Sequence, residues 1–438
     1  MALAAGRSLL GASQGAGPID ALSAREAALR ILSEVSRQPP LRIPLDDALG
    51  CVLAEPLVSP LDIPPWTNSA MDGYAVRGVD VRGAARESPR TLRVVEQLPA
   101  GAFPTRAIGP GECARIFTGA PLPEQADSVI RQEDTDQGDT EVRIYQDRDV
   151  GVNIRRAGED IRKGATVLDA GTELGAAQLG LLASLAVGHP VVYRRPRVAI
   201  LGSGDEIVDV DRPEDILSGR KVASSNTHTL MALVRLAGGL PVNLGIARDS
   251  PESLRKHLRP VYDCDLLITT AGLSVGEHDY VKAVLEELGA EIRFWKLRMR
   301  PGAPVGFGLL RAGGQAGARP LPWIGLPGNP VSTMVTFELF VRPAIRQMVG
   351  HTAPFRATRR VRVAEAIKLG PRLQHFLRAV VADGQARLTG PQGSGILTSM
   401  AQANALLIIP EGQHETPAGS EADALMLDET RHQREPGY

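Results

Sequence analysis

The sequence predicts a multidomain α/β protein with a mainly parallel sheet covered on both faces, strand-rich amino-terminal lobes and a small carboxyl-terminal β-barrel or sandwich. Between residues 197 and 348, short apolar runs alternate with stretches of helical periodicity, which is the pattern of parallel βαβ units. Residues 41–196 and 354–438 instead carry short apolar runs separated by proline and glycine, which favours small strand-rich regions. The chain therefore divides into a central α/β region between two strand-rich regions.

The bulk composition excludes several classes of protein. The chain has 438 residues, of which 43% are hydrophobic, so it can bury cores in about three domains. Its formal net charge of -1 lacks the basic excess of a nucleic-acid binder. No apolar run approaches the ~18 residues that a membrane span needs. We therefore expect a protein that binds neither nucleic acid nor membrane.

Cysteine usage and the first residues indicate the compartment. Cys51, Cys113 and Cys264 are odd in number, widely spaced and without a CxxC pair, which favours reduced thiols over disulfides or a zinc site. Residues 1–19 are rich in Ala, Gly and Ser, and their apolar stretch is too short and too broken for a signal peptide. We expect a disordered tail there and a cytoplasmic location for the protein.

Individual elements follow from periodicity and capping signals. Residues 20–35 are predicted to form a helix in which Ser23 and Glu26 have capping-box spacing. A second helix is expected over residues 175–185. In the central region the expected strands are 198–201, 242–246, 266–270 and 292–297, and the expected helices are 226–236, the segment opened by Pro251, 280–288 and 331–348.

Four loops of the central region are candidates for a binding site, because ligands of a parallel sheet bind outside the carboxyl ends of its strands. They are GSGDE (202–206), AGLSVGEHD (271–279), KLRMRPGAP (296–304) and LPGNP (326–330). Glycines let the backbone approach an anion, helix amino ends favour negative charge, and acidic with basic residues suit a phosphate and a divalent metal. Each loop alone could be an ordinary turn, a helix cap or a solvated basic edge.

The amino-terminal half adds three polar loops. They are TNSAMDGYA (67–75), IFTGAPLP (116–123) and NIRRAGED (153–160). Their alternatives are a hairpin turn, a strand terminus and a surface ion pair, the last of which contributes little to stability. The residues themselves predict an anion and metal site and leave the reaction open.

In this order, the segments resemble the molybdopterin molybdenumtransferase family, whose bacterial members are called MoeA. The resemblance runs from about residue 20 to the end, and its markers are NSAMDGYAV (68–76), FTGAPLP (117–123), NIRRAGED (153–160), GDE (204–206), SVGEHDY (274–280) and GLPGNPVS (325–332). It implies a homodimer of elongated protomers, in which the ligand domain of one protomer faces an amino-terminal lobe of its partner. The implied domains are a tail (1–19), a two-lobed amino-terminal region (20–195), a doubly wound molybdopterin-binding domain (196–350) and a β-barrel (354–438).

The resemblance also implies a reaction and its residues. Adenylylated molybdopterin and molybdate give molybdenum cofactor and AMP, with Mg2+ assisting. The matching positions assign catalysis to Asp72, Asp160, Glu206, Asp279 and Lys296, substrate binding to Thr118, Arg155, Asn226, Ser274, Arg300, Pro327, Pro330 and Ser394, and the metal to Asp249, Glu206 and Asp279.

Under this hypothesis each charged group has a physical task. The metal offsets negative charge that grows on a phosphoanhydride. Lys296 and Arg300 attract the anions, while Asp72 and Asp160 position or deprotonate a reacting group.

Three departures from the family pattern keep other functions open. The family usually has lysines at the positions of Arg300 and Ala303. It usually has a serine-threonine pair where this chain has residues 202–203, and a serine followed by two glycines where this chain has residues 270–272. Loss of a buried charged hydrogen bond at Ala303 would cost about 1–3 kcal/mol of anion binding. The alternatives are a divergent non-catalytic molybdopterin-binding or docking paralogue, and an adenylyltransferase that attaches AMP to molybdopterin.

Overall fold

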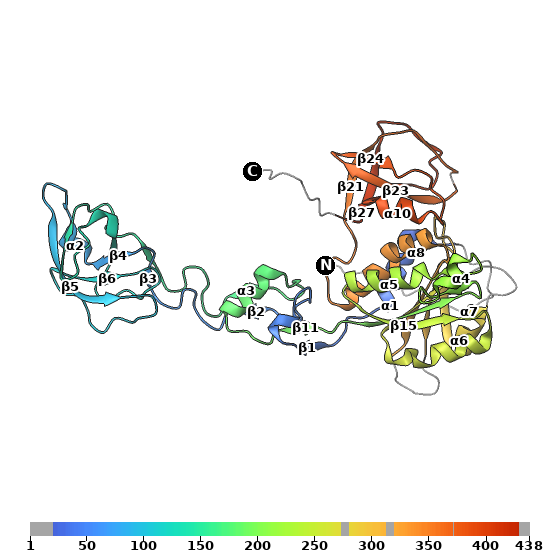
Figure 1. Cartoon of the computed structure of the whole chain (residues 1–438), viewed down its shortest axis with the longest axis horizontal. Coiled ribbons are helices and arrows are strands. Elements are labelled where there is room, and N and C mark those ends of the chain that lie inside the picture. The colour runs from blue at the N-terminus through green and yellow to red at the C-terminus, as the bar shows by residue number, and fades with distance from the viewer. Residues whose placement is uncertain (1–20, 273–279, 312–318, 371, 429–438) are drawn as a thin grey trace, which may run out of the picture. The chain divides into compact units, whose positions relative to one another are not determined.

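The structure, a computed structural model, describes residues 21–272, 280–311, 319–370 and 372–428 (Figure 1). Its contacts divide the chain into two compact units. Unit 1 comprises Met1–Ile43, Gly50–Ala54 and Val191–Tyr438, and unit 2 comprises Pro44–Leu49 and Glu55–Pro190. The expected tail at 1–19 lies outside the described residues.

Unit 1 contains the predicted mainly parallel sheet, with strand order β15-β12-β16-β20-β19-β17. The first four strands are parallel to one another, and β19 runs antiparallel to both β20 and β17. The strands are β12 Arg197–Ser203, β15 Leu240–Ala247, β16 Leu266–Thr270, β17 Ala290–Phe294, β19 Gly306–Leu310 and β20 Leu321–Leu326. The predicted strand at 266–270 is thereby confirmed to the residue.

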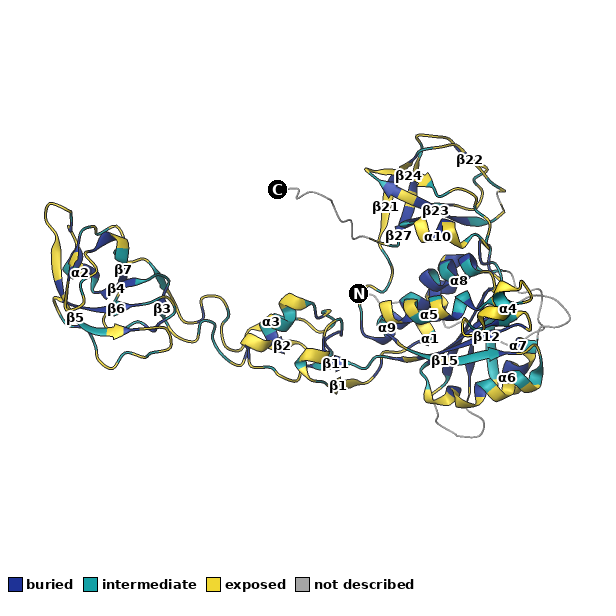
Figure 2. Cartoon of the chain, in the orientation of Figure 1, coloured by how far each residue is buried: buried dark blue, intermediate teal, exposed yellow. Residues whose placement is uncertain are grey.

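Helices cover both faces of this sheet, which confirms the doubly wound fold (Figures 1 and 2). Alternate residues of β12 point to opposite faces, so Val198 and Ile200 join one core, whereas Ala199 and Leu201 join the other. Helices on the first face are α1 Ala24–Glu34, α5 Ser225–Leu236, α8 Pro330–Thr336 and α9 Arg342–Met348, and those on the second are α6 Pro251–Leu258 and α7 Tyr280–Glu287.

The helix expected over 331–348 begins one residue earlier and is not uniformly α-helical. Pro330 occupies the first turn of α8, where the missing N–H of proline costs nothing. A π-helical segment, η4 Phe337–Val341, then connects α8 to α9. Pro343 offers no amide to the carbonyl four residues before it, which accounts for a break in the α-helical hydrogen-bond pattern at this place.

The amino-terminal helix α1 packs in unit 1 against helices that come 300 residues later. Its predicted capping box is confirmed, because the Ser23 amide donates to Glu26 Oε2 (2.8 Å) and the Glu26 amide donates to Ser23 Oγ (3.2 Å). Its buried face shares a core with α9, and Gln347 Nε2 donates to the carbonyls of Leu32 and Val35. The sequence predicts this helix, and tertiary packing determines its partner.

The carboxyl-terminal region of unit 1 forms a closed five-stranded barrel rather than a sandwich. The strand order is β23-β24-β21-β27-β25, and pairing of β25 with β23 closes it. The strands are β21 Thr358–Val363, β23 Gln374–Ala382, β24 Gln385–Leu388, β25 Ala405–Ile409 and β27 Glu421–Met426. A short strand of the α/β part, β18 Met299–Arg300, pairs in parallel with β23 and joins the barrel to the sheet domain.

Unit 2 is built on a five-stranded sheet with strand order β7-β4-β6-β5-β8. Tyr74 and Val76 pack on one face of the sheet and Ala75 on the other, so both faces bury a core. The elements of the unit are β2 Leu57–Val58, β3 Asn68–Ser69, β4 Gly73–Val76, α2 Gly78–Val81, β5 Arg90–Leu98, β6 Glu112–Ile116, β7 Ser128–Arg131, β8 Glu141–Ile144, β9 Ile154–Arg155, β10 Thr166–Leu168 and α3 Ala176–Ser184.

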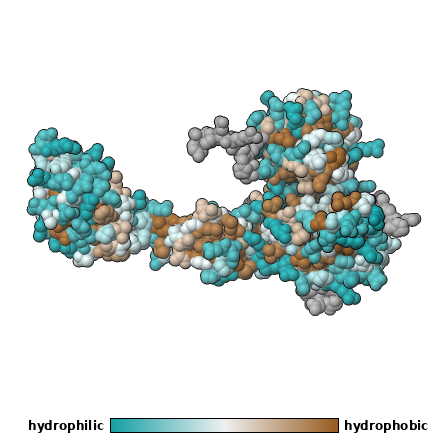
Figure 3. All heavy atoms as spheres, in the orientation of Figure 1, coloured by the Kyte–Doolittle hydropathy of each residue, from teal (hydrophilic) through white to brown (hydrophobic). Residues whose placement is uncertain are grey.

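Helix α3 is apolar along most of its length, and its residues Leu179 and Leu181 are half-buried. It consists of alanine, leucine and glycine with one glutamine and one serine, yet Leu182 is its one buried residue. Figure 3 shows hydrophobic side chains on the visible face of the segment that carries α3 and β2. None of the helices in the described part of the chain combines the length and hydropathy needed to cross a membrane.

Candidate functional site

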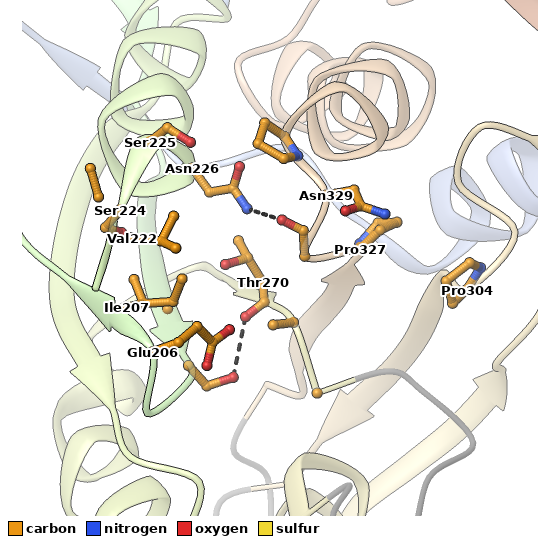
Figure 4. Close-up of a pocket in the computed structure, with 17 residues that line it drawn as sticks. Glu206, Ile207, Val222, Ser224, Ser225, Asn226, Thr270, Pro304, Pro327 and Asn329 are labelled. Carbon is orange, nitrogen blue, oxygen red and sulfur yellow. Dashed lines mark hydrogen bonds between the residues drawn. The ribbon is translucent and has the colours of Figure 1, made fainter. Parts of the chain in front are cut away.

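A cavity of about 460 Å³ lies at the carboxyl ends of β12, β16 and β20, where the sequence predicts a binding site (Figure 4). It is lined by the loop after each of these strands and by the first residues of α5 and α8. Its described lining residues are Gly202, Ser203, Glu206, Ile207, Val222, Ala223, Ser224, Ser225, Asn226, Thr270, Ala271, Gly272, Pro304, Pro327, Gly328, Asn329 and Pro330. Four residues predicted from the sequence, Glu206, Asn226, Pro327 and Pro330, thus share one cavity.

One wall of the cavity is the loop that enters α8. Asn226 Nδ2 donates to the carbonyl of Gly328 (2.7 Å), which ties α5 to this loop. Thr333 Oγ1 donates to the Pro327 carbonyl (2.6 Å) from within the helix. The Val331 amide donates to the carbonyl of Ser394 (3.1 Å), so the predicted serine of the barrel region reaches the start of α8. These bonds fix the loop and the first turn of α8 beside the cavity, and a helix amino end favours negative charge.

The opposite wall is the turn after β12, and it depends on glycine. Gly204 has φ +137°, a backbone conformation that side chains strongly disfavour. A Cβ atom at Gly204 would meet Glu206 Oε2 at 2.9 Å and Ile207 Cγ1 at 2.9 Å. The missing side chain therefore lets Glu206 fold back over the turn. Figure 4 shows Glu206 and Asn226 extending from their backbones into the same cavity.

Asp249 lines a different cavity, of about 770 Å³, on the other side of the same turn. The amide of Asp205 donates to Asp249 Oδ2 (3.3 Å), and the amide of Asp249 donates to Asp205 Oδ1 (3.4 Å). Lys221 Nζ donates to the carbonyl of Asp205 (2.7 Å). Sequence reasoning missed Asp205, although it stands in the GDE marker beside Glu206.

The described residues do not include a complete set of metal ligands. No three His, Cys, Asp or Glu side chains lie together as a metal site within the described ranges. The predicted ligands Glu206 and Asp249 line separate cavities. The third predicted ligand, Asp279, and the predicted substrate contact Ser274 lie outside the described residues.

The predicted basic residues stand away from the lining of the first cavity. Lys296 and Arg300 are exposed, and neither is among its described lining residues. Arg300 belongs to β18, opposite His375 of the barrel strand β23. The same loop reaches the cavity through Pro304, while the carbonyl of Ala303 accepts the amides of Leu297 (2.8 Å) and Val305 (3.1 Å). This loop is thereby shaped by backbone bonds that a lysine or an alanine at 303 could equally make.

A second group of predicted residues gathers in unit 2 around Asp72. One carboxylate oxygen of Asp72 accepts both the Thr118 amide (2.8 Å) and the Thr118 hydroxyl (2.7 Å). The amide and then the hydroxyl of Thr118, with a weaker contribution from Arg115, hold the pKa of Asp72 below its usual value against a small opposing effect of burial. Asp72 is therefore an ionised, hydrogen-bonded carboxylate at neutral pH.

Arg115 packs beside the Asp72 group, and the sequence analysis did not predict it. Its guanidinium lies over the rings of Tyr74 (4.8 Å) and Phe117 (5.3 Å), and Nη2 donates to Gln132 Oε1 (2.6 Å). The Gln132 amide in turn donates to the carbonyl of Asp72 (3.1 Å). A signal was present in the sequence, because an arginine interrupts the otherwise apolar end of β6.

The other two predicted residues of unit 2 lie on the NIRRAGED loop. Arg155 is paired with Asn68 across the two-stranded sheet of β3 and β9, and its side chain is exposed. Asp160 is also exposed, and its amide donates to the carbonyl of Ile63 (3.0 Å). The Ala70 amide donates to the Asn153 carbonyl (2.9 Å), which holds this loop beside the segment that leads to Asp72.

Comparison with known families covers almost the whole described chain. Residues 22–186 match the model of the MoeA N-terminal region (domain I and II). Residues 199–347 match a probable molybdopterin binding domain, and residues 360–427 match the MoeA C-terminal region (domain IV). The cavity at the sheet edge lies within the second match, and the Asp72 group lies within the first.

Whole-chain relatives agree with the family models. A molybdopterin molybdenumtransferase from Nostoc sp. is 38% identical over 388 residues, covering 87% of this chain and 86% of the relative. A molybdopterin molybdenumtransferase 2 from Mycobacterium tuberculosis is 38% identical over 402 residues, covering 90% and 96%. The crystal structure of a molybdopterin biosynthesis MoeA protein from Pyrococcus horikoshii superposes with a TM-score of 0.77 at 28% identity, covering 93% of this chain and 100% of that one. The chain therefore belongs to the MoeA family, the family of the molybdopterin molybdenumtransferases.

Proposed function

We propose that this protein is a molybdopterin molybdenumtransferase, which uses adenylylated molybdopterin and molybdate to form molybdenum cofactor and releases AMP. The observation that carries the proposal is the sheet-edge cavity, in which Glu206 and Asn226 converge with the amino end of α8. This combination suits a phosphate-bearing ligand, because backbone amides and a helix amino end attract the anion. Family membership supplies the reaction class.

The loop at 327–330 would bind a phosphate group of the substrate. Asn226 and Thr333 hold its carbonyls, so that the loop is positioned before the ligand arrives. Lys296 and Arg300 are exposed on a neighbouring loop and would attract anions at longer range rather than by direct contact inside the cavity. Ser394 and Pro330 would complete the substrate-binding surface at the start of α8.

The carboxylates of unit 1 suit magnesium in type. Mg2+ is usually held by one or two carboxylates together with water and substrate phosphates, so a set of three protein ligands is not required. Glu206 in the first cavity and Asp249 in the second offer exposed carboxylate oxygens. Asp279, implied by the family resemblance, would join them. When bound, the cation would offset negative charge on the phosphoanhydride.

Asp72 would position a reacting group rather than remove its proton. A carboxylate whose pKa is lowered by two hydrogen bonds is a weak base, but it is a strong and fixed hydrogen-bond acceptor. Thr118 provides those bonds, and exposed Arg155 would supply a positive charge from the neighbouring loop. Of the two aspartates assigned to positioning or proton transfer, exposed Asp160 would then be left for proton transfer.

A homodimer would cover the apolar surface around α3. Leu49 and Val58 are exposed in the same segment as this helix, and surfaces of this kind mark subunit contacts. Replacing Val58 with glutamate should therefore lower the molecular mass measured by light scattering toward that of one chain. Val79→Glu, at an exposed valine elsewhere in unit 2, is the control and should leave the mass unchanged.

A single assay tests the proposed reaction. The purified protein is given adenylylated molybdopterin and Mg2+, with and without molybdate, and AMP is measured. Release that depends on molybdate is the expected result. Binding without release would favour a docking role instead. Arg300 and Ala303, which depart from the family pattern, are the residues that leave this role open. Transfer of AMP from ATP to bare molybdopterin would favour an adenylyltransferase.

A further inference from the structure

Unit 2 carries an exposed aromatic pair, Trp66 and Phe103. The ring centroids are 4.9 Å apart and the planes meet at 69°, which is an edge-to-face contact. The side chains remain 36% and 56% exposed, although burial of such large rings is favourable. Two rings held against each other at the surface form a preorganised apolar platform.

The platform lies beside the Asp72 group. Trp66 Nε1 donates to the carbonyl of Gly119 (3.4 Å), and Gly119 directly follows Thr118, which donates twice to Asp72. Gly119 has φ +86°, and a Cβ atom there would meet nothing within 4 Å. The turn that joins Trp66 to Thr118 is therefore open to solvent, and a ligand bound at Asp72 can extend over it.

A buried acceptor next to the platform is left unused. Asn68 is 6% exposed, and its Nδ2 donates to the carbonyl of Trp66 (3.3 Å). Its Oδ1 has no hydrogen-bond partner in the described part of the chain, which is uncommon for a buried polar atom. Asn68 also lies opposite Arg155 in the pairing of β3 with β9. The backbone that follows Trp66 is therefore tied to the strand that carries Arg155.

We propose that Trp66 and Phe103 form a stacking platform for a fused nitrogen heterocycle of the substrate. This rests on the proposed function, whose substrate contains two such rings, a pterin and an adenine. Aromatic side chains stack on rings of this class without needing a shaped pocket. A protein partner is a poorer occupant, because a stable interface needs about 800 Å² from each partner, far more than two rings supply.

Binding of each ring is measured separately on the full-length protein. AMP and pterin-6-carboxylate are the two probes, and calorimetry with quenching of tryptophan fluorescence gives the dissociation constants. Trp66 is a suitable reporter, because Trp323 is buried and Trp295 is half-buried. One probe should quench the emission of the wild-type protein, which identifies the ring that stacks.

The variants Trp66→Ala and Phe103→Ala should each weaken binding of that probe about five- to a hundredfold. Trp66→Phe should stay within about threefold of wild type, because it keeps an aromatic face. Phe355→Ala, at an exposed phenylalanine of unit 1, is the matched control and should bind as wild type. With adenylylated molybdopterin as substrate, both alanine variants should raise KM by a similar factor and keep kcat within about threefold of wild type. This is the result expected when a contact stabilises the bound substrate and the transition state equally.

Either of two results would overturn the proposal: neither probe binds the wild-type protein, or both alanine variants bind as tightly as wild type does. If those variants also change the molecular mass, the pair is a contact between copies of the chain. Phe103→Ala decides the matter if Trp66→Ala fails to fold. If the ring binds through the pair but no AMP is released from the substrate, the proposed reaction fails and the platform stands.

Discussion

The two groups of site residues hold their carboxylates in opposite ways. In unit 2, one oxygen of Asp72 accepts two hydrogen bonds from Thr118, and the positive charge of Arg115 also stabilises the carboxylate. In unit 1, Glu206 folds over Gly204 and lines a cavity, and no described residue donates to its carboxylate. The first carboxylate is therefore fixed before a ligand arrives, whereas the second keeps its lone pairs for a ligand or a cation.

The two arrangements suit different chemical tasks. A fixed acceptor is suited to orienting a reacting group, since its geometry does not change when substrate binds. An open carboxylate on a glycine turn is suited to joining a metal that also binds substrate phosphate. Variants in unit 2 should therefore lose turnover, whereas variants in unit 1 should change stability or substrate affinity.

The largest effect is expected at Asp72. Asp72→Asn keeps the size of the side chain but removes its charge, so kcat/KM should fall by about 100-fold or more. The measurement is molybdate-dependent AMP release at saturating Mg2+. Asp139→Asn, at an exposed aspartate of the same unit, should remain within about threefold of wild type. A fall of less than threefold at Asp72 would show that its fixed carboxylate plays no part in turnover.

The turn that carries Glu206 should tolerate no side chain at Gly204. Gly204→Ala places a Cβ atom in a disfavoured conformation and against Glu206, which should cost about 1–3 kcal/mol of unfolding free energy. Gly202→Ala is the matched control, since its Cβ atom would meet its nearest neighbours at 3.6 Å or more. Urea unfolding of the full-length protein measures both. Equal stability of the two variants would mean that the turn is not constrained as described.

Removing the hydroxyl donor to Asp72 should change the pH dependence of both activity and stability. Thr118→Val removes the hydroxyl donor, so the pKa of Asp72 should rise toward its usual value, and the acid limb of the kcat/KM profile should move to higher pH. A carboxyl with a lowered pKa stabilises the native state above its unfolded pKa and loses that contribution as the pH falls through its folded pKa.

The stability difference between wild type and Thr118→Val should therefore be full at neutral pH and shrink in acid. Thermal unfolding across the pH range measures it. Thr118→Ser, which keeps the hydroxyl, is the control and should retain the wild-type acid limb. An acid limb that does not move in Thr118→Val would separate Asp72 from the ionisation that controls activity.

The smallest effect is expected at Asn226. Asn226→Ala removes the 2.7 Å bond to the Gly328 carbonyl, which should lower the free energy of unfolding by about 0.5–1.5 kcal/mol. The same change should raise KM about two- to tenfold and leave kcat nearly unchanged. Thr229→Ala, on the same helix but outside the described lining of the cavity, should have the KM of wild type. A large fall in kcat would instead place Asn226 at the reacting atoms.

Much of unit 1 could be predicted because local patterns agreed with the final packing. The capping box at Ser23, the strand at 266–270 and the alternation of strands with helices all appear as expected. Strands β19 and β20 were not predicted at all. The antiparallel direction of β19 is also absent from the sequence pattern, because an apolar run does not encode its direction in a sheet. The choice of barrel over sandwich depended on the pairing of β23 with β25, which lie far apart in sequence.

The candidate site was predicted less completely than the fold. The sequence indicated Glu206 and Asn226, and both line one cavity. It did not indicate Arg115, whose contribution depends on two rings and a glutamine that only folding brings to it. It also did not indicate the reciprocal bonds of Asp205 and Asp249, which join the turn after β12 to the turn after β15.

Residue patterns alone specify which segments become helices and strands, which turns need glycine and which polar motifs mark the family, because these depend on neighbours within a few residues. Tertiary structure decides that α1 packs on α9, that Glu206 and Asp249 line separate cavities and that the Trp66 indole donates beside Thr118. Those contacts join residues that are distant in the chain. They form only when burial of apolar surface across the whole unit repays the entropy of ordering it.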